Sequence, residues 1–304
     1  MIVRSTPLRC PLLAAAICAV LGVAASAQPP SRRVQPFQNG KHEASGVVEV
    51  PGGGGVLFVD DGRPKHVFWM GLSGSGADAT RVAPVTLHAD VPDMEDITSD
   101  GRFIYVVGSQ SQGGGRKTDG LVRFKFDART LVVSDVQSAT GLRQILAEAL
   151  PDLLGGRRRS DGLNIEGLTW DAAHGRLLLG LRSPMAGEDA VIVPLRMRDP
   201  SAPLSTANLD VGAVVRLPLS GRAIRGLGYD AERHMVLILA GASTDGPGLP
   251  FLLYEWDGGT PGRGLRQVAT LPQQEKPEGV TRVHLAGAAR TMLVFDTSGF
   301  LILD

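Results

Sequence analysis

The feature that most constrains the fold is a pair of short apolar segments that recurs five times along the chain. Each pair opens with a charged or polar residue, passes through a turn rich in Gly, Asp or Ala, and continues into a strongly apolar segment with a polar exit. The repeats begin at Glu43, Asp93, Asn164, Ala223 and Lys276, and their second segments read VLFVD, FIYVVG, LLLGL, VLILAG and MLVFD. Such internal repetition is typical of a fold built from copies of one structural unit.

Each of the first four repeats continues with two more strand-like segments, such as HVFWMGL and APVTLH in the first. Four short antiparallel strands in about 40 to 50 residues are typical of a β-propeller blade. The fifth repeat ends with GFLILD and lacks a fourth strand. We therefore predict an all-β, five-bladed β-propeller in which Val34–Phe37 closes the ring against the C-terminal blade and removes an exposed sheet edge. A six-bladed ring and a β-sandwich are the alternatives.

The long spacing between the second and third repeats contains the segment GLRQILAEALPDLL, residues 141–154. Its apolar residues recur at intervals of three and four, which predicts a short amphipathic helix. The basic loop GGRRRSDG follows it. We interpret the whole segment as a helical insertion packed on one face of the ring.

The first 27 residues read as a cleaved secretory signal peptide. Arg4 and Arg9 precede the apolar run Pro11–Val23, and Ala25-Ser26-Ala27 forms a small-residue cleavage site. The run is short for a membrane span. An uncleaved anchor and lipidation at Cys18 are the less favoured alternatives. We expect one propeller domain over residues 28–304, located in the periplasm or outside the cell.

Cysteine content and charge narrow the remaining choices. Cys10 and Cys18 both lie in the predicted signal peptide, so residues 28–304 contain no cysteine and no disulfide. The chain has 31 basic and 31 acidic residues, and removal of Arg4 and Arg9 leaves 29 against 31, a net charge of −2. This balance argues against a nucleic-acid partner. We expect no membrane association after signal cleavage, and a monomer.

The topology of a blade places many polar residues on one face. In an up-and-down sheet the first strand begins on the face where the second strand ends. The predicted strand-opening residues, which ring the axis on that face, are Ser45, Glu95, Glu166, Arg225 and Glu278. The predicted strand-exit residues beside them are Asp60, Asp61, Ser109, Gln110, Arg182, Ser183, Ser243 and Asp296. Loops gathered on a rigid scaffold commonly carry function.

Three carboxylates near one channel mouth need an opposite charge nearby. The first candidate for balancing Glu95, Glu166 and Glu278 is calcium, which accepts carboxylate oxygens in irregular geometry. The second is pairing with Arg225 and Arg182, which we favour. No other cofactor is indicated. The chain contains no GxSxG, HExxH, Walker or Rossmann motif.

Three histidines fall in the predicted turns on the opposite face: His174, His234 and His284. A three-histidine metal site is one interpretation of this pattern. Because these turns splay outward from the axis, we interpret the histidines as solvated turn residues.

Three runs carry a family resemblance: GLNIEGLTWDAAHGRLLLGLRSP at 162–184, DMEDITSDGRFIYVVGSQS at 93–111 and GRAIRGLGYD at 221–230. They resemble the bacterial domain-of-unknown-function 3616 family from Glu43 to the C-terminus. The family more often has GSHS where this chain has GSQS. The resemblance implies an exported propeller-like protein and assigns no catalytic residue.

A looser similarity connects the chain to calcium-dependent lactonases and esterase-like phytase propellers, which also open inner strands with Glu-Gly. In lactonases that glutamate is a calcium ligand, so the resemblance implies Glu166 as the first ligand. The lactonase pattern also uses asparagines on neighbouring blades. In this chain the only asparagine at a blade opening is Asn164, which lies beside Glu166 on the same blade.

Two functions follow as hypotheses. The first is a non-catalytic binder of a small polar or anionic ligand, or of a protein, through Arg182, Arg225, Ser183, Asp60, Asp296 and Asn164, helped by the loop Arg157–Arg159. The second is a calcium-dependent hydrolase of phosphoesters or lactones, with Glu95, Glu166 and Glu278 on the metal and metal-bound water as nucleophile. Glutamate oxygens that point to one common position would favour the hydrolase. Glutamates that each pair with an arginine would favour the binder.

Overall fold

The computed structural model of the chain describes residues 34–72, 81–111, 120–154, 162–244, 249–260, 263–271 and 274–303. They belong to one compact unit, Arg32–Asp304. The predicted signal peptide and the Arg157–Arg159 loop lie outside the described residues. The export and the monomeric state of the protein therefore stay predictions. Within these ranges, no helix is long and apolar enough to cross a membrane.

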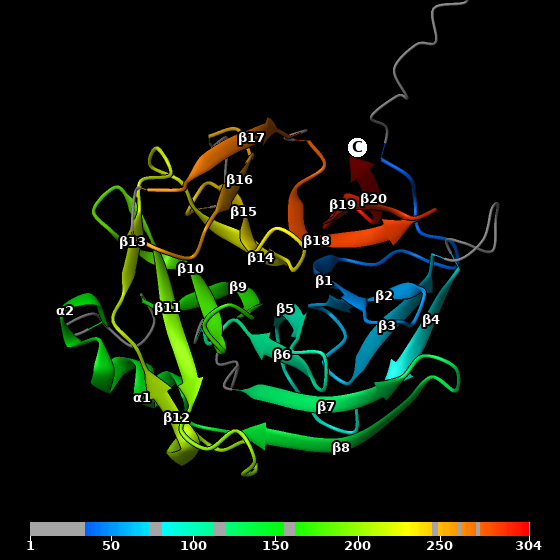
Figure 1. Ribbon diagram of the computed structural model, residues 1–304, viewed down its shortest axis with the longest axis horizontal. Helices are drawn as coiled ribbons and strands as arrows, with labels where there is room; N and C mark the ends of the chain where they lie inside the picture. Colours follow the sequence, from blue (N-terminus) through cyan, green and yellow to red (C-terminus); the bar gives the residue numbers. More distant parts are fainter. Residues whose placement is uncertain are drawn as a thin grey trace, which may run out of the picture. The chain divides into compact units, whose positions relative to one another are not determined.

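The strands form five antiparallel sheets, which we number as blades 1 to 5 in chain order (Figure 1). Blade 1 contains β1 (Ala44–Val50), β2 (Gly55–Asp60), β3 (His66–Gly71) and β4 (Val82–Thr86). Blade 2 contains β5 (Met94–Ser99), β6 (Ile104–Gly108), β7 (Leu121–Asp127) and β8 (Val132–Ala139). Blade 3 contains β9 (Asn164–Asp171), β10 (Arg176–Ala186), β11 (Asp189–Met197), β12 (Leu209–Val211) and β13 (Val215–Leu217).

Blades 4 and 5 complete the set. Blade 4 contains β14 (Ala223–Asp230), β15 (Met235–Gly241), β16 (Leu252–Trp256) and β17 (Arg266–Thr270). Blade 5 contains only β18 (Pro277–Leu285), β19 (Ala288–Phe295) and β20 (Gly299–Leu303). The first strand of each blade contacts the first strands of both neighbouring blades, which closes the ring around an axis (Figure 1). The prediction of a five-bladed all-β propeller is confirmed, and six blades and a sandwich are excluded.

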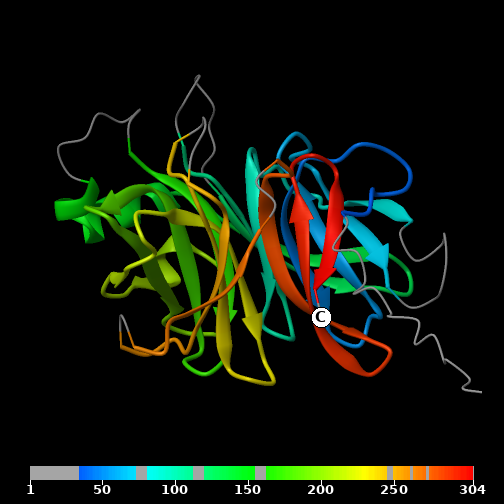
Figure 2. The same cartoon turned by 90° about the horizontal axis from the view of Figure 1, so that it is seen from above.

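The apolar second strands explain how the blades hold together. Every residue of β2 and of β6 is buried, as expected for strands whose unbroken apolar runs are covered on both faces. Leu57 from β2 and Val106 from β6 share one core cluster, so the space between blades 1 and 2 is filled by side chains from both sheets. Figure 2 shows the sheets from the side, with their turns gathered at two opposite faces.

The predicted helical insertion is confirmed as two short helices, α1 (Leu142–Ala149) and α2 (Pro151–Leu154). The break falls at Leu150, because the residue before a proline is disfavoured in the helical conformation. Leu142 and Leu146 are buried in a core cluster together with strands of blades 2 and 3. The insertion is thus anchored by its apolar stripe.

The N-terminal segment contacts the incomplete blade 5. Gln35 and Phe300 exchange two backbone hydrogen bonds of 2.8 Å in a single antiparallel bridge on β20. Phe37 stacks on Phe58 of blade 1, with ring centroids 4.7 Å apart. The segment predicted to supply an outer strand, 34–37, therefore reaches blade 5 through one bridge rather than a continuous strand.

Close packing of the inner strands fills the axis. A Cβ atom on Gly46 would lie 2.4 Å from Oδ1 of Asp96, and one on Gly226 would lie 2.4 Å from the carbonyl oxygen of Glu278. Glycine is required where two backbones approach this closely. Asp96 stands at the equivalent position of blade 2 and is fully buried.

Candidate functional site

A β-bulge at the same position of every blade builds the site. In each blade the pairing with the second strand skips one residue of the first strand, and these five residues are Ser45, Glu95, Glu166, Arg225 and Glu278. A bulge inserts one unpaired residue and re-aims its side chain. The residues that the sequence placed in a ring at one channel mouth are therefore the bulge residues.

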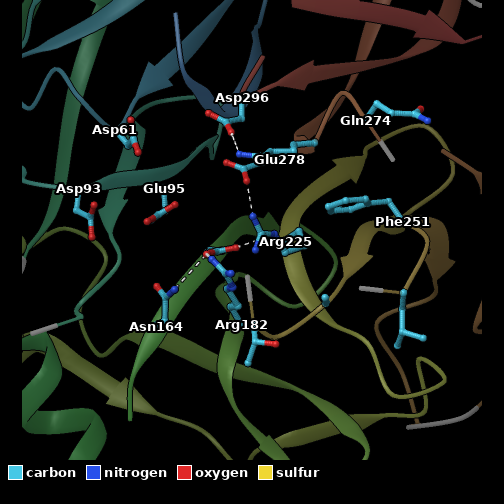
Figure 3. A pocket seen from close by; sticks show the side chains of 15 residues that line it. Asp61, Asp93, Glu95, Asn164, Arg182, Arg225, Phe251, Gln274, Glu278 and Asp296 are labelled. Carbon is cyan, nitrogen blue, oxygen red and sulfur yellow. Dashed lines mark hydrogen bonds and ion pairs between the residues drawn. The ribbon is translucent and has the colours of Figure 1, made fainter. Parts of the chain in front are cut away.

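A pocket of about 740 Å³ opens at this mouth and takes lining residues from all five blades and the segments that connect them. The lining residues are Asp61, Asp93, Glu95, Asn164, Glu166, Arg182, Arg225, Ala242, Thr244, Leu249, Phe251, Gln274, Lys276, Glu278 and Asp296. Figure 3 shows Asp61, Asp93 and Glu95 on one side, Arg225 in the middle, and Phe251 on the other side. The pocket is therefore acidic on one side and mixed on the other.

A chain of ion pairs crosses the middle of the pocket. Arg225 Nε lies 3.0 Å from Glu166 Oε2, and Arg225 Nη2 also contacts Glu278 Oε1. Arg182 Nη1 lies 2.8 Å from Glu166 Oε1, to which Asn164 Nδ2 donates a hydrogen bond of 3.1 Å. Glu166 and Arg225 are buried. This arrangement, which we call the arginine ladder, joins blades 3, 4 and 5 and occupies the oxygens of two glutamates.

The third glutamate has a different environment. Glu95 has no hydrogen-bond or ion-pair partner among the described residues. Burial raises the pKa of Glu95 well above its usual value, and the nearby carboxylates of Glu166, Asp93 and Glu278 raise it further. A carboxyl group in this setting favours either a bound proton or a cation.

Two other carboxyl groups of the pocket share this tendency. Burial, followed by repulsion from Glu43, raises the pKa of Asp61 to about 6. Burial also raises the pKa of Glu278 to about 7, and the Arg225 guanidinium only partly offsets that effect. Three carboxyl groups of one pocket thus have a raised affinity for protons.

Asp93 and the rim are held by polar neighbours. The Asp93 carboxylate accepts hydrogen bonds from the hydroxyl groups of Ser109 and Ser111, the second of them 3.4 Å long. At the blade 5 rim, Lys276 Nζ lies 2.6 Å from Asp296 Oδ2. The lysine of the pocket is therefore ion-paired, as both arginines are.

Seven of the nine predicted site residues line the pocket: Arg182, Arg225, Asp296, Asn164, Glu95, Glu166 and Glu278. Asp60 and Ser183 do not. Asp60 is buried and faces His42 Nδ1 at 3.4 Å and Arg63 Nε at 3.6 Å, while its neighbour Asp61 lines the pocket. Ser183 lies on β10, before a cis peptide bond to Pro184.

Sequence reasoning missed the apolar side of the pocket. Leu249 and Phe251 precede β16 and Gln274 precedes β18, outside the five pairs of apolar segments, and Lys276 was noted only as the start of the fifth pair. The only signal in the sequence is the loop-like run STDGPGLP at residues 243–250, between β15 and β16. Its length does not indicate which side chain turns inward.

The predicted calcium site is not assembled in this arrangement. Within the parts of the chain that the structure describes, no three His, Cys, Asp or Glu side chains are grouped so as to hold a metal ion. Glu166 and Glu278 direct oxygens to Arg225 instead. Calcium binding stays a prediction.

These features define a five-bladed β-propeller with a polar pocket at one mouth of its axis. The family described as "Protein of unknown function (DUF3616)" matches residues 149–299 of the chain. The match runs from the end of α1 into blade 5 and includes the arginine ladder. Among curated proteins, no sequence matches the chain.

Solved structures match the chain at low sequence identity. Glutaminyl cyclase from Myxococcus xanthus is 12% identical, with 90% of this chain and 96% of that chain covered and a TM-score of 0.48. A glucose dehydrogenase is 14% identical, with coverage of 90% and 99% and a TM-score of 0.47. A gluconolactonase-like protein is 13% identical, with coverage of 90% and 93% and a TM-score of 0.47. Likeness at this level carries no argument about activity.

Proposed function

We propose that the protein is a non-catalytic binding propeller whose pocket holds a small polar ligand through a cationic group of that ligand. The observation that carries the proposal is the state of Glu95. Its carboxyl group stands at the bulge of blade 2 without a partner among the described residues, while Arg182, Arg225 and Lys276 are ion-paired with other carboxylates.

The charges of the pocket support a cation over an anion. The lining contains six carboxyl groups against three basic side chains. An anion would have to compete with Glu166 and Glu278 for Arg225, which both already contact. A cation placed beside Glu95 would offset the repulsion from neighbouring carboxylates, Glu166 and Asp93 above all, that adds to burial in raising the pKa of Glu95.

The size and lining of the pocket favour a small molecule. A volume of about 740 Å³ lies in the range of small-molecule sites, which is roughly 300 to 1,000 Å³. Phe251, which lies across the pocket from Glu95 (Figure 3), and Leu249, which also lines the pocket, offer apolar contact to the body of such a ligand. No His, Cys, Ser or Tyr side chain is among the described lining residues, so they contain no pair of a hydroxyl or thiol nucleophile and a histidine base.

The test is a thermal-shift and calorimetry panel with putrescine, choline, citrate, phosphate, glucose and calcium chloride as probes. Binding to the native state alone at 100 times the dissociation constant adds about 2.7 kcal/mol, which gives a visible shift in melting temperature. We expect an organic cation to stabilise the wild-type protein and Glu188→Gln, and to lose this effect in Glu95→Gln. Glu188 is the matched control because it is exposed and does not line the pocket.

The other outcomes distinguish the remaining functions. Stabilisation by citrate or phosphate but by no cation would refute the proposal and favour an anionic ligand. A shift with calcium alone, lost in Glu95→Gln, would instead support the calcium-dependent hydrolase, and phosphoesters and lactones would then be assayed as substrates.

A further inference from the structure

One imidazole connects three blades on the face opposite the pocket. His284 lies near the end of β18 in blade 5, and its backbone N–H donates a 2.6 Å hydrogen bond to Glu49 Oε1 of β1. Its ring Nδ1 lies 2.7 Å from Glu49 Oε2, and its ring Nε2 lies 3.0 Å from Glu232 Oε1. Glu232 belongs to the turn after β14. Blade 5 is therefore joined to both of its neighbours through one side chain.

The geometry fits a protonated ring. A neutral imidazole has one N–H donor and one acceptor nitrogen, whereas the imidazolium ion has two donors. Both ring nitrogens of His284 face carboxylate oxygens. In the neutral ring, one of these contacts would bring two acceptors together without a hydrogen between them.

Blade 5 is also the blade for which such a connection matters most. It contains three strands, and the described N-terminal segment adds only the Gln35–Phe300 bridge to its outer edge. Its remaining links to the ring are therefore mainly between neighbouring blades. Besides His284, they include the Glu278–Arg225 pair at the pocket and the pair of Arg282 Nε with Asp230 Oδ2 at 3.0 Å.

We propose that His284 is a pH-dependent clasp, which holds blade 5 to blades 1 and 4 when its imidazole is protonated and loosens when the proton leaves. The hydrogen bond to Glu49, followed by the one to Glu232, raises the pKa of His284 above its usual value. The stability that the clasp contributes is fully present below the unfolded pKa of about 6.5. It is lost as the pH rises through the higher folded pKa.

The other charged groups near the clasp are Asp230, Arg282 and Arg290, which pairs across the sheet with Val283, and Glu278 lies at the far end of β18. Glu278 itself titrates, with its pKa raised to about 7 by burial. All four residues are unchanged in the variants compared below. Their contributions therefore cancel when each variant is compared with the wild-type protein at the same pH.

The experiment compares the wild-type protein with His284→Gln, Glu232→Gln and His234→Gln at pH 6 and pH 9, by thermal melting and by amide hydrogen exchange. His234 is the matched control, because it lies in the turn between the first two strands of blade 4, and its one hydrogen-bond partner among the described residues is the hydroxyl group of Tyr229, at 3.4 Å. Exposed ion pairs contribute little to the free energy of unfolding. We therefore expect His284→Gln to lower the melting temperature by about 1–2 °C at pH 6, and by less at pH 9, where the imidazole has lost its proton.

Hydrogen exchange locates the effect. In His284→Gln the amides of β18 and β1 should exchange faster than in the wild-type protein at pH 6, and the difference should shrink at pH 9. Glu232→Gln, an exposed substitution that leaves His284 and Glu49 in place, should show part of the same pH-dependent loss. Equal differences at both pH values, or the same losses in His234→Gln, would overturn the proposal.

Discussion

Replacement of Asp96 tests the inner layer of the ring directly. The Asp96 side chain is fully buried on the axis, in the layer immediately beyond the pocket-lining Glu95. Its Oδ2 accepts hydrogen bonds from the backbone N–H groups of Leu168, at 2.7 Å, and Leu227, at 3.1 Å, and its Oδ1 accepts one from Ile97, at 2.8 Å. One carboxyl group thus joins blade 2 to blades 3 and 4.

The expected magnitude follows from these three contacts. Asp96→Ala leaves the N–H groups of Leu168 and Leu227 without an acceptor, and each unsatisfied buried donor costs about 1–3 kcal/mol. Removal of a buried carboxyl group offsets part of this loss, so we expect a decrease of about 2–4 kcal/mol in the free energy of unfolding. Asp96→Asn can keep its oxygen toward both blades and place only its NH₂ group against Ile97, which should cost about 1 kcal/mol.

The dependence on pH sharpens this test. Burial raises the pKa of Asp96 well above its usual value, and the three hydrogen bonds from backbone N–H groups lower it only in part. The folded state therefore binds a proton more tightly than the unfolded state does. The stability linked to that proton is greatest below the unfolded pKa and falls as the pH rises through the folded one. Because asparagine does not titrate, the advantage of the wild-type protein over Asp96→Asn should shrink from pH 5 to pH 9.

The assay is urea unfolding followed by tryptophan fluorescence, with the wild-type protein and both variants at each pH. An unchanged slope against denaturant would show that the same surface is exposed on unfolding. A loss below 1 kcal/mol in Asp96→Ala would refute the value assigned to the hydrogen bonds between blades. A wild-type advantage over Asp96→Asn that grows with pH would refute the raised pKa.

Two further predictions concern the pocket. Arg225→Met should lower the free energy of unfolding by about 2–4 kcal/mol, because Glu166 stays buried without this partner. Adding Glu278→Gln to this variant should recover part of the loss. Urea unfolding of the wild-type protein, both single variants and the double variant measures this coupling. Additive effects of the two substitutions on the free energy of unfolding would contradict an energetic link between Arg225 and Glu278 in the arginine ladder. The affinity for an organic cation should rise from pH 5 to pH 8, since Asp61, whose pKa is raised to about 6, and Glu95 give up protons as the cation binds. Calorimetry in buffers of different ionisation enthalpy measures that proton release. An affinity for the cation that does not change with pH would contradict this prediction.

The fold could be predicted because its signal is repeated. Five copies of the same pair of apolar segments gave the blade count, and the spacing of leucines gave the helical insertion now seen as α1 and α2. The ring of polar residues followed from topology alone. The bulge that re-aims them could not be predicted, because it depends on the pairing register between two strands, as at Glu166 between β9 and β10.

The partner of each side chain was harder to predict than its position. Asp60 and Asp61 are adjacent at the end of β2, and neighbouring residues of a strand point to opposite sides. Only the structure shows that Asp60 turns toward His42, whereas Asp61 lines the pocket. His284 was interpreted as a solvated turn residue. It is exposed, but it lies on β18, and its carboxylate partners come from β1 and from the turn after β14, distant in sequence.

The inner layer also determines how a ligand would enter and leave. No residue that lines the pocket also lines the hollow of about 150 Å³ near His284 on the opposite face. Between the two, the close approaches at Gly46 and Gly226 and the buried side chain of Asp96 fill the axis. The pocket is therefore separated from the hollow on the opposite face, and the proposed ligand would enter and leave past the charges at its mouth. Substitutions at Glu95 should accordingly change affinity, whereas substitutions at His284 should change the stability of blade 5.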